Sequence, residues 1–205
     1  MPQASAHALS EAACHLRRLV DFAEPRLDDT CLDLDCGTSD VLNPWVRHVT
    51  SADAASVPEG PFTLITACLT PTPDTDPVAL IQRLFGVCAG RLVISDLVRT
   101  RGGDSGRLER LRDPARTATR TFRELMDLVR EAGGETRRLE VFTIERPIDP
   151  WLADVDDGDR IRNELTAELD GGPKTGARPR LIGRELWFTQ SWAYVAAEPA
   201  RASRT

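Results

Sequence analysis

The stretch Leu32 to Asp40 (LDLDCGTSD) has the residue types and spacing of a turn that holds a nucleotide-like ligand. A short apolar strand, Thr30 to Asp35, runs into a cluster of small residues, and a helical segment follows. In such an arrangement glycine lets the backbone approach the ligand, and the start of the helix offers unpaired N–H groups. The stretch therefore predicts a binding turn at the carboxyl end of a strand.

A second group of charged residues lies at the end of the apolar strand Arg91 to Val98 and in the segment that follows it. Ligands of open α/β sheets bind beyond the carboxyl ends of the strands, and guanidinium groups bind carboxylate, sulfate or phosphate. We therefore expect a pocket for an anionic small molecule here. The candidate catalytic residues are Asp96, Asp113, Arg112 and Arg116, and the candidate substrate-binding residues are Arg99, Arg101 and Arg120. The alternative is an exposed surface on which these arginines pair with the acids Asp96, Asp104, Glu109 and Asp113.

The hydrophobic pattern predicts helices that alternate with buried strands. Helices are expected at 8–23, 76–88, 107–112, 121–132 and 159–169, with one or two helical turns in 41–47, and Gly90 is expected to end the second helix. Strands are expected at 30–35, 48–52, 61–69, 91–98, 139–145 and 185–197. This alternation predicts an α/β fold with a doubly wound, mostly parallel sheet and a C-terminal antiparallel hairpin. We expect one domain over residues 1–205, with frayed ends at 1–8 and 199–205.

The ordered series of segments from about residue 10 to 198 resembles class I S-adenosylmethionine (SAM) methyltransferases, in particular the ubiquinone/menaquinone-methyltransferase-like subgroup. Leu32 to Ser39 resembles motif I of that family, LDxGxGxG. Gly90 to Asp96 (GRLVISD) resembles a later strand, and Arg110 to Pro114 (RLRDP) resembles the substrate-side region. The resemblance implies a methyltransferase-like Rossmann sheet with SAM as the family's cofactor.

The sequence departs from this family in its cofactor residues. Motif I has three glycines, of which only Gly37 is kept; Asp35 replaces the first and Ser39 replaces the third. Asp35 adds a side chain and a charge where the backbone should approach the ligand. Asp53 matches either the acid that binds the ribose hydroxyls or a later acid that meets adenine. We therefore interpret Asp35, Gly37, Ser39 and Asp53 as a vestigial cofactor site.

The chain is also short in this region. Only 24 residues separate Gly37 from Phe62, so one helix and one strand of the family are missing. The family's histidine pair after the fourth strand is replaced by Leu69 to Pro73 (LTPTP), and Ala115 stands where a histidine often follows Asp-Pro. Two general bases are therefore lost.

Composition excludes several function classes. The net charge of −6 argues against binding to nucleic acid or to an anionic membrane. No apolar stretch is long enough to span a bilayer, and the N-terminus does not resemble a signal peptide, so a cytoplasmic location is expected.

Five cysteines and three scattered histidines predict no metal site, and Cys36 is interpreted as a small buried residue rather than a nucleophile. Abundant arginine and a single lysine are typical of a GC-rich, for example actinobacterial, genome.

Three hypotheses remain open. The first is a ring-forming enzyme of bacterial natural-product biosynthesis, or a subunit of one, that displaces an anionic leaving group without a cofactor. The second is a non-catalytic subunit of a heterodimer, with a homodimer as a further possibility, because a shortened sheet exposes strand edges. The third is a SAM-dependent small-molecule methyltransferase with an unusual site.

Overall fold

The computed structural model describes residues 15–69, 76–99, 105–112, 119–153 and 155–200. The N-terminal helix is described over 15–23. The later helices are α2 (Ser39–Leu42), the 3-10 helix η1 (Asn43–Trp45), α3 (Pro77–Val87), α4 (Ser105–Arg112), α5 (Phe122–Glu131), α6 (Ile148–Trp151) and α7 (Gly158–Leu169). The strands are β1 (Thr30–Leu34), β2 (His48–Ala52), β3 (Phe62–Cys68), β4 (Cys88–Leu97), β5 (Gly134–Pro147), β6 (Arg180–Ile182) and β7 (Glu185–Pro199).

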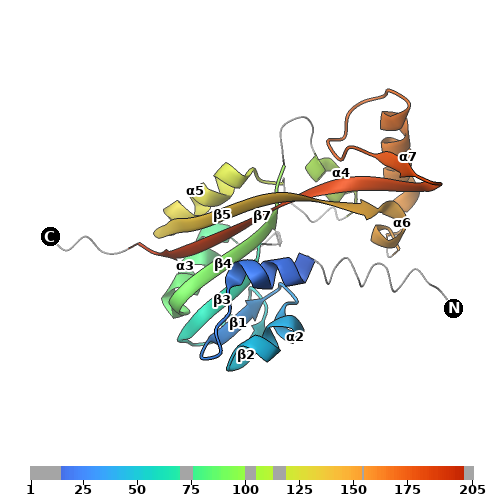
Figure 1. Ribbon diagram of the computed structural model, residues 1–205. Coiled ribbons are helices and arrows are strands. Elements are labelled where there is room, and N and C mark those ends of the chain that lie inside the picture. The colour runs from blue at the N-terminus through green and yellow to red at the C-terminus, as the bar shows by residue number, and fades with distance from the viewer. Residues whose placement is uncertain (1–14, 70–75, 100–104, 113–118, 154, 201–205) are drawn as a thin grey trace.

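All seven strands form one sheet in the order β2-β1-β3-β4-β7-β5, and β6 pairs with β7 (Figure 1). The four strands from β2 to β4 are parallel, whereas β7 is antiparallel to β4, β5 and β6. This topology confirms the predicted mostly parallel sheet with an antiparallel C-terminal hairpin. The carboxyl ends of β1, β2, β3 and β4 meet at one edge of the sheet, where ligands of such folds bind.

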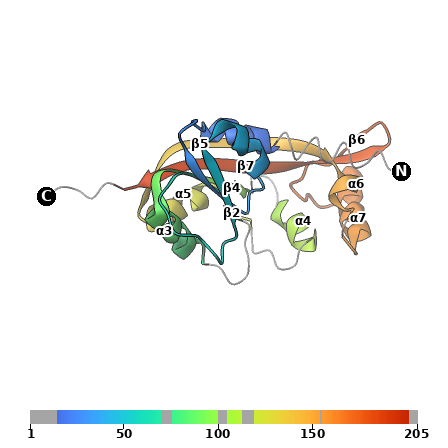
Figure 2. The same cartoon turned by 90° about the horizontal axis from the view of Figure 1, so that it is seen from below.

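Helices cover both faces of the sheet (Figure 2). Helix 15–23 and α2 lie on one face, and α3 and α5 lie on the other, where Leu80, Ile81, Leu84, Leu125 and Val129 join the main apolar core. A third cluster joins α4, α6 and α7 to β7 through Trp151 and Phe188, whose rings lie 4.6 Å apart. The long β5–β7 ribbon carries α6 and α7 beyond the parallel strands (Figure 1).

The predicted shortening after motif I is confirmed. The only helical residues between β1 and β2 form the four-residue α2 and the three-residue η1. Residues 53–61, all of them described, contain no helix or strand before β3 begins. Consequently β2 is the edge strand of the sheet, and one of the two strands expected in the family between Gly37 and Phe62 is missing.

The prediction that Gly90 ends a helix is wrong. Helix α3 already ends at Val87, and Gly90 lies inside β4. A Cβ atom at this position would lie 2.1 Å from the backbone oxygen of Thr63 on β3. Glycine is therefore required by the close approach of two strands.

Two short elements, α6 and β6, were not predicted, and β5 begins five residues before the predicted strand. The first half of β5 consists largely of charged residues, from Glu135 to Arg138, which hide its strand character. Residues 1–8 and 201–205 lie outside the described part of the chain, and β7 extends to Pro199. In the described part, no helix is both long and apolar enough to cross a membrane.

Candidate functional site

The turn after β1 is organised by the buried carboxylate of Asp33. One of its oxygens accepts hydrogen bonds from the backbone N–H of Ser39 at 2.8 Å and from the Ser39 hydroxyl at 2.7 Å. The other accepts a hydrogen bond from the Thr66 hydroxyl on the neighbouring β3 at 3.3 Å. Asp33 thereby binds the first turn of α2 and fixes the shape of the loop between them.

The side chains of Asp35 and Ser39 link this turn to β2 and to the loop that follows β2. The Asp35 carboxylate accepts a hydrogen bond from the backbone N–H of Ala54 at 3.0 Å, and the hydroxyls of Ser39 and Ser51 lie 2.6 Å apart. Asp35 adopts a φ of +56°, and Gly37 adopts +66°. Asp35 and Ser39 therefore join the turn after β1 to β2 and to the loop that follows it.

Asp53, the candidate ribose-binding acid, is engaged in its own turn. One carboxylate oxygen accepts hydrogen bonds from the hydroxyl of Ser56 at 2.7 Å and from the N–H groups of Ser56 at 2.8 Å and Ala55 at 3.0 Å. The hydrogen bonds from Ser56, the hydroxyl above all, hold the pKa of this exposed carboxyl below its ordinary value. The carboxylate thus stabilises the loop after β2.

Cys36 lies between Asp35 and Gly37 in this turn, and its free thiol forms a hydrogen bond with the free thiol of Cys68. Burial raises the pKa of the Cys36 thiol well above its ordinary value, and the hydrogen bond with Cys68 raises it further. The start of α2 therefore does not activate this thiol, which agrees with its interpretation as a small residue of the turn.

On the substrate side, Asp96 and Arg120 are brought together. Arg120 Nη1 donates to Asp96 Oδ2 at 3.1 Å, and the two side chains are 19% and 8% exposed respectively. The backbone of Arg120 forms an isolated parallel β-bridge with Val98, just after β4. In addition, the Arg99 N–H donates a hydrogen bond of 2.8 Å to the backbone oxygen of Arg120. This pair lies at the carboxyl end of β4 and is largely buried, whereas the alternative interpretation of the sequence placed such pairs on an exposed surface.

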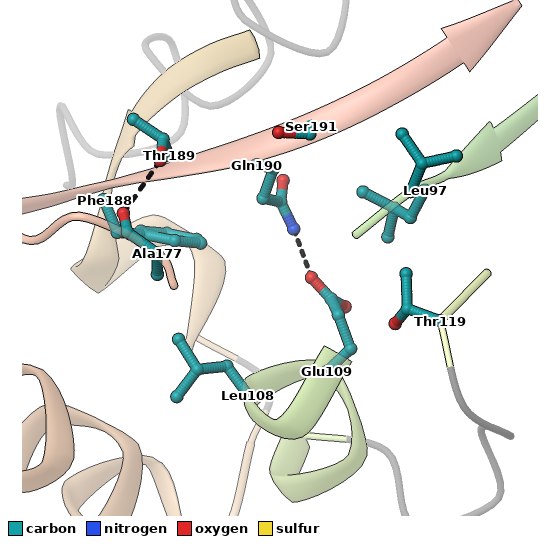
Figure 3. Close-up of a pocket in the computed structure, with 10 residues that line it drawn as sticks. Leu97, Leu108, Glu109, Thr119, Ala177, Phe188, Thr189, Gln190 and Ser191 are labelled. Carbon is teal, nitrogen blue, oxygen red and sulfur yellow. Dashed lines mark hydrogen bonds between the residues drawn. The ribbon is translucent and has the colours of Figure 1, made fainter. Parts of the chain in front are cut away.

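A second buried carboxylate, Glu109 on α4, lies at the same end of the sheet (Figure 3). The side-chain amide of Gln190 on β7 donates to Glu109, and its oxygen accepts a hydrogen bond from Arg146 at 2.8 Å. These residues flank a cavity of about 10 Å³, which has room for one water molecule. Its lining is partly polar and consists of Leu97, Val98, Leu108, Glu109, Thr119, Ala177, Phe188, Thr189, Gln190 and Ser191.

The remaining predicted residues are dispersed. Arg99 pairs with Glu124 at 3.0 Å on the exposed surface. The Arg112 guanidinium lies 5.1 Å from the centre of the Trp151 ring, and its Nε is buried without a hydrogen-bond partner among the described residues. Arg101, Asp113 and Arg116 lie outside the described residues. The catalytic and substrate-binding roles of this whole set stay predictions.

Sequence reasoning considered Glu109 only as an ion-pair partner and did not single out Gln190. The sequence does indicate that Gln190 faces inward. It lies two residues from Phe188 and two residues from Trp192 on β7, and residues two apart on a strand point to the same face. Glu109 follows Leu108 in a short helix whose polar pattern gives no inward face. Only the packing of α4 on β7 brings the two side chains together.

The sequence matches no protein-family model and no curated protein. Several solved structures are similar to this protein in fold. A putative methyltransferase from Bacillus halodurans C-125 is similar with a TM-score of 0.73 and 15% identity, over 90% of this chain and 98% of that protein. Geranyl diphosphate C-methyltransferase from Streptomyces coelicolor A3(2), solved with S-adenosyl-L-homocysteine, is similar with a TM-score of 0.56 and 14% identity, over 92% and 80% of the two chains.

The chain has the class I methyltransferase fold. A further similar structure is the [4+2]-cyclase SpnF, with a TM-score of 0.52 and 15% identity over 90% of this chain and 80% of SpnF. Identities this low show the fold alone, because one fold hosts many chemistries. The function must therefore be argued from the contacts in the site.

Proposed function

We propose that this protein uses the methyltransferase fold without SAM as a methyl donor and closes a ring in a small anionic substrate. The observation that carries the first half is the Asp35 carboxylate, which occupies the first glycine position and is bonded to Ala54 N–H at 3.0 Å. The second half rests on the buried acids and the arginine at the carboxyl end of β4.

The residues of the turn do not fit SAM. A cofactor there must contact the backbone at positions 35 to 39, where this chain has the side chains of Asp35 and Ser39. Both are engaged in contacts that join β1 to β2, and the Asp35 carboxylate would repel the carboxylate of the SAM methionine group. The acid expected to hold the ribose, Asp53, accepts three hydrogen bonds from its own turn.

Ring closure within one substrate molecule needs no methyl donor such as SAM. A nucleophilic atom of the substrate forms a bond to one of its own carbon atoms, while the bond from that carbon to a sulfate or phosphate group breaks. The electron pair of the broken bond leaves with the anion. In the proposed reaction Asp96 takes the proton of the nucleophile, and Arg120, 3.1 Å from Asp96, donates hydrogen bonds to the departing anion.

The similarity to SpnF supports the proposal at the level of the fold, since that protein is a cyclase on the same scaffold. The test uses linear compounds that carry a sulfate or phosphate ester and an internal amine or hydroxyl. Release of the inorganic anion and of a cyclic product in the absence of SAM is expected, with loss of both in Asp96→Asn. Product formation that requires SAM, or anion release that Asp96→Asn leaves unchanged, would overturn it.

A second candidate function is that of a subunit in a larger assembly. The edge strand β2 has exposed residues at His48 and Ser51, and the family's outer strand is missing beside it. An unpaired edge is a surface that a partner can extend. Sedimentation of the purified chain tests this candidate, because a monomer that turns over substrate alone has no need of a partner.

A further inference from the structure

A groove of about 710 Å³ lies on the face opposite to α3 and α5, between helix 15–23 and the α2–η1 segment. It is lined by Arg17, Val20, Asp21, Glu24, Pro25, Asp40, Val41, Pro44 and Trp45. The acids Asp96 and Glu109 of the proposed active site do not line it. Its volume is within the range of sites that bind ligands or side chains of a partner.

The groove has an apolar floor and an exposed aromatic residue. Val20, Val41 and two prolines supply the apolar surface, and Trp45 is 57% exposed although it is the largest side chain in the lining. Trp45 ends a three-residue helix and belongs to none of the three apolar clusters found in the described part of the chain. Exposed aromatic surface of this kind marks interaction sites.

The charges around the groove are unbalanced. Among its lining residues, three carboxylates, those of Asp21, Glu24 and Asp40, outnumber the one cation, Arg17. Glu24 is paired with Arg138, but within the described part of the chain neither Asp21 nor Asp40 has an ion-pair partner. By contrast, other acids near helix 15–23 are paired, for example Asp29 with Arg91 at 2.8 Å.

We propose that this groove docks a cationic, amphipathic segment of another protein. Lysine or arginine side chains of that segment pair with Asp21 and Asp40, and one of them stacks on the Trp45 ring. Its apolar side chains cover the valines and prolines. A second copy of this chain is the wrong partner electrostatically, because the chain has a net charge of −6 and would bring further negative charge to an acidic surface.

The proposal is independent of the chemistry proposed for the carboxyl end of β4, since the two sites have no residue in common. The probe is a synthetic amphipathic peptide with arginine on one face and leucine on the other, and the control peptide has glutamine in place of arginine. Binding is measured by calorimetry and by tryptophan fluorescence at two salt concentrations, and the part of the fluorescence change due to Trp45 is the part that Trp45→Ala removes from the signal of the four tryptophans. The variants are Asp21→Asn/Asp40→Asn, Trp45→Ala and, as a control, Asp159→Asn, whose carboxylate on α7 is 96% exposed.

The arginine peptide is expected to bind, and the glutamine peptide is not. Affinity should fall about tenfold or more in Asp21→Asn/Asp40→Asn and in Trp45→Ala, weaken with salt and remain unchanged in Asp159→Asn. Equal affinity in the Asn/Asn variant and the control would overturn the proposal, as would the absence of binding at millimolar peptide. A wild-type dimer that Trp45→Ala converts to a monomer would also overturn it, because the occupant would then be a second copy. Thermal unfolding of each variant verifies that the fold is retained.

Discussion

The carboxylate of Asp35 lies 3.0 Å from the backbone nitrogen of Ala54 and accepts its hydrogen bond. This contact joins the turn after β1 to the loop that follows β2. Asp35 makes it in a left-handed conformation, with φ +56°, which an aspartate tolerates better than most residues. In this structure the hydrogen bond holds the negative charge of the exposed Asp35 carboxylate at the turn.

The first prediction concerns that bond. Asp35→Gly/Ser39→Gly restores the glycines of motif I and removes both side-chain links to the β2 side. We expect the variant to bind SAM measurably by calorimetry, whereas Asp127→Asn, a control on α5, binds none. Failure of the glycine variant to gain affinity, with its fold retained, would mean that the missing strand alone prevents binding.

The second prediction compares two arginine–acid pairs. Arg120→Met removes the ion pair with Asp96, whose side chain is 8% exposed, and should lower the free energy of unfolding by roughly 3 kcal/mol, because a largely buried carboxylate loses this cation. Arg99→Met breaks the exposed pair with Glu124 and should cost less than about 1 kcal/mol. Urea unfolding measures both variants. Equal losses would show that the Asp96 pair is solvated.

The third prediction compares two glycines. Gly90→Ala places a methyl group 2.1 Å from the Thr63 oxygen and should destabilise the sheet by roughly 2 kcal/mol, since two strands must separate. Gly86→Ala, on α3, meets nothing within 4 Å and should stabilise the helix by up to about 1 kcal/mol. Thermal unfolding should therefore shift in opposite directions, and a shift in the same direction contradicts the assignment.

The fourth prediction is a pH dependence of stability set by His15. Its Nδ1 lies 2.6 Å from the buried Tyr194 hydroxyl, and burial, with a smaller effect of Arg146, lowers the pKa of His15 from 6.5 to about 4. The unfolded chain takes up a proton near its ordinary pKa and the folded chain does not, so stability falls as pH decreases from about 6.5 to about 4. The loss is at most about 3 kcal/mol.

In His15→Gln this dependence should flatten, and the urea midpoint between pH 7 and pH 5 measures the difference. His48→Gln is the matched control, since His48 is exposed on the edge strand. An identical slope in wild type and His15→Gln would mean that other groups set the pH dependence.

Much of this fold was predictable because its signals are local. The apolar run from Phe62 to Cys68 and the alternation in β7 are strand signals wherever they occur, and the missing strand follows from counting residues between Gly37 and Phe62. Strand β6 has three exposed residues and exists only because β7 lies beside it. No local pattern could reveal it.

The site was predictable only in part, for the same reason. The departure of Asp35 from motif I is visible in the sequence, but its bond to Ala54 depends on the position of a loop 19 residues away. Asp96 was a candidate because it lies near the carboxyl end of a predicted strand, and Arg120 because it lies in the region that follows; their roles stay predictions. The Glu109–Gln190 contact joins residues separated by 81 positions, and only the packed structure shows it.

The central claim is that this methyltransferase fold does not use SAM. The most direct measurement is calorimetric titration of SAM and of S-adenosylhomocysteine into the purified wild-type chain. We predict no heat of binding up to millimolar ligand, while Asp35→Gly/Ser39→Gly binds. Micromolar affinity of the wild-type chain for either ligand would contradict the claim and return the protein to methyl transfer.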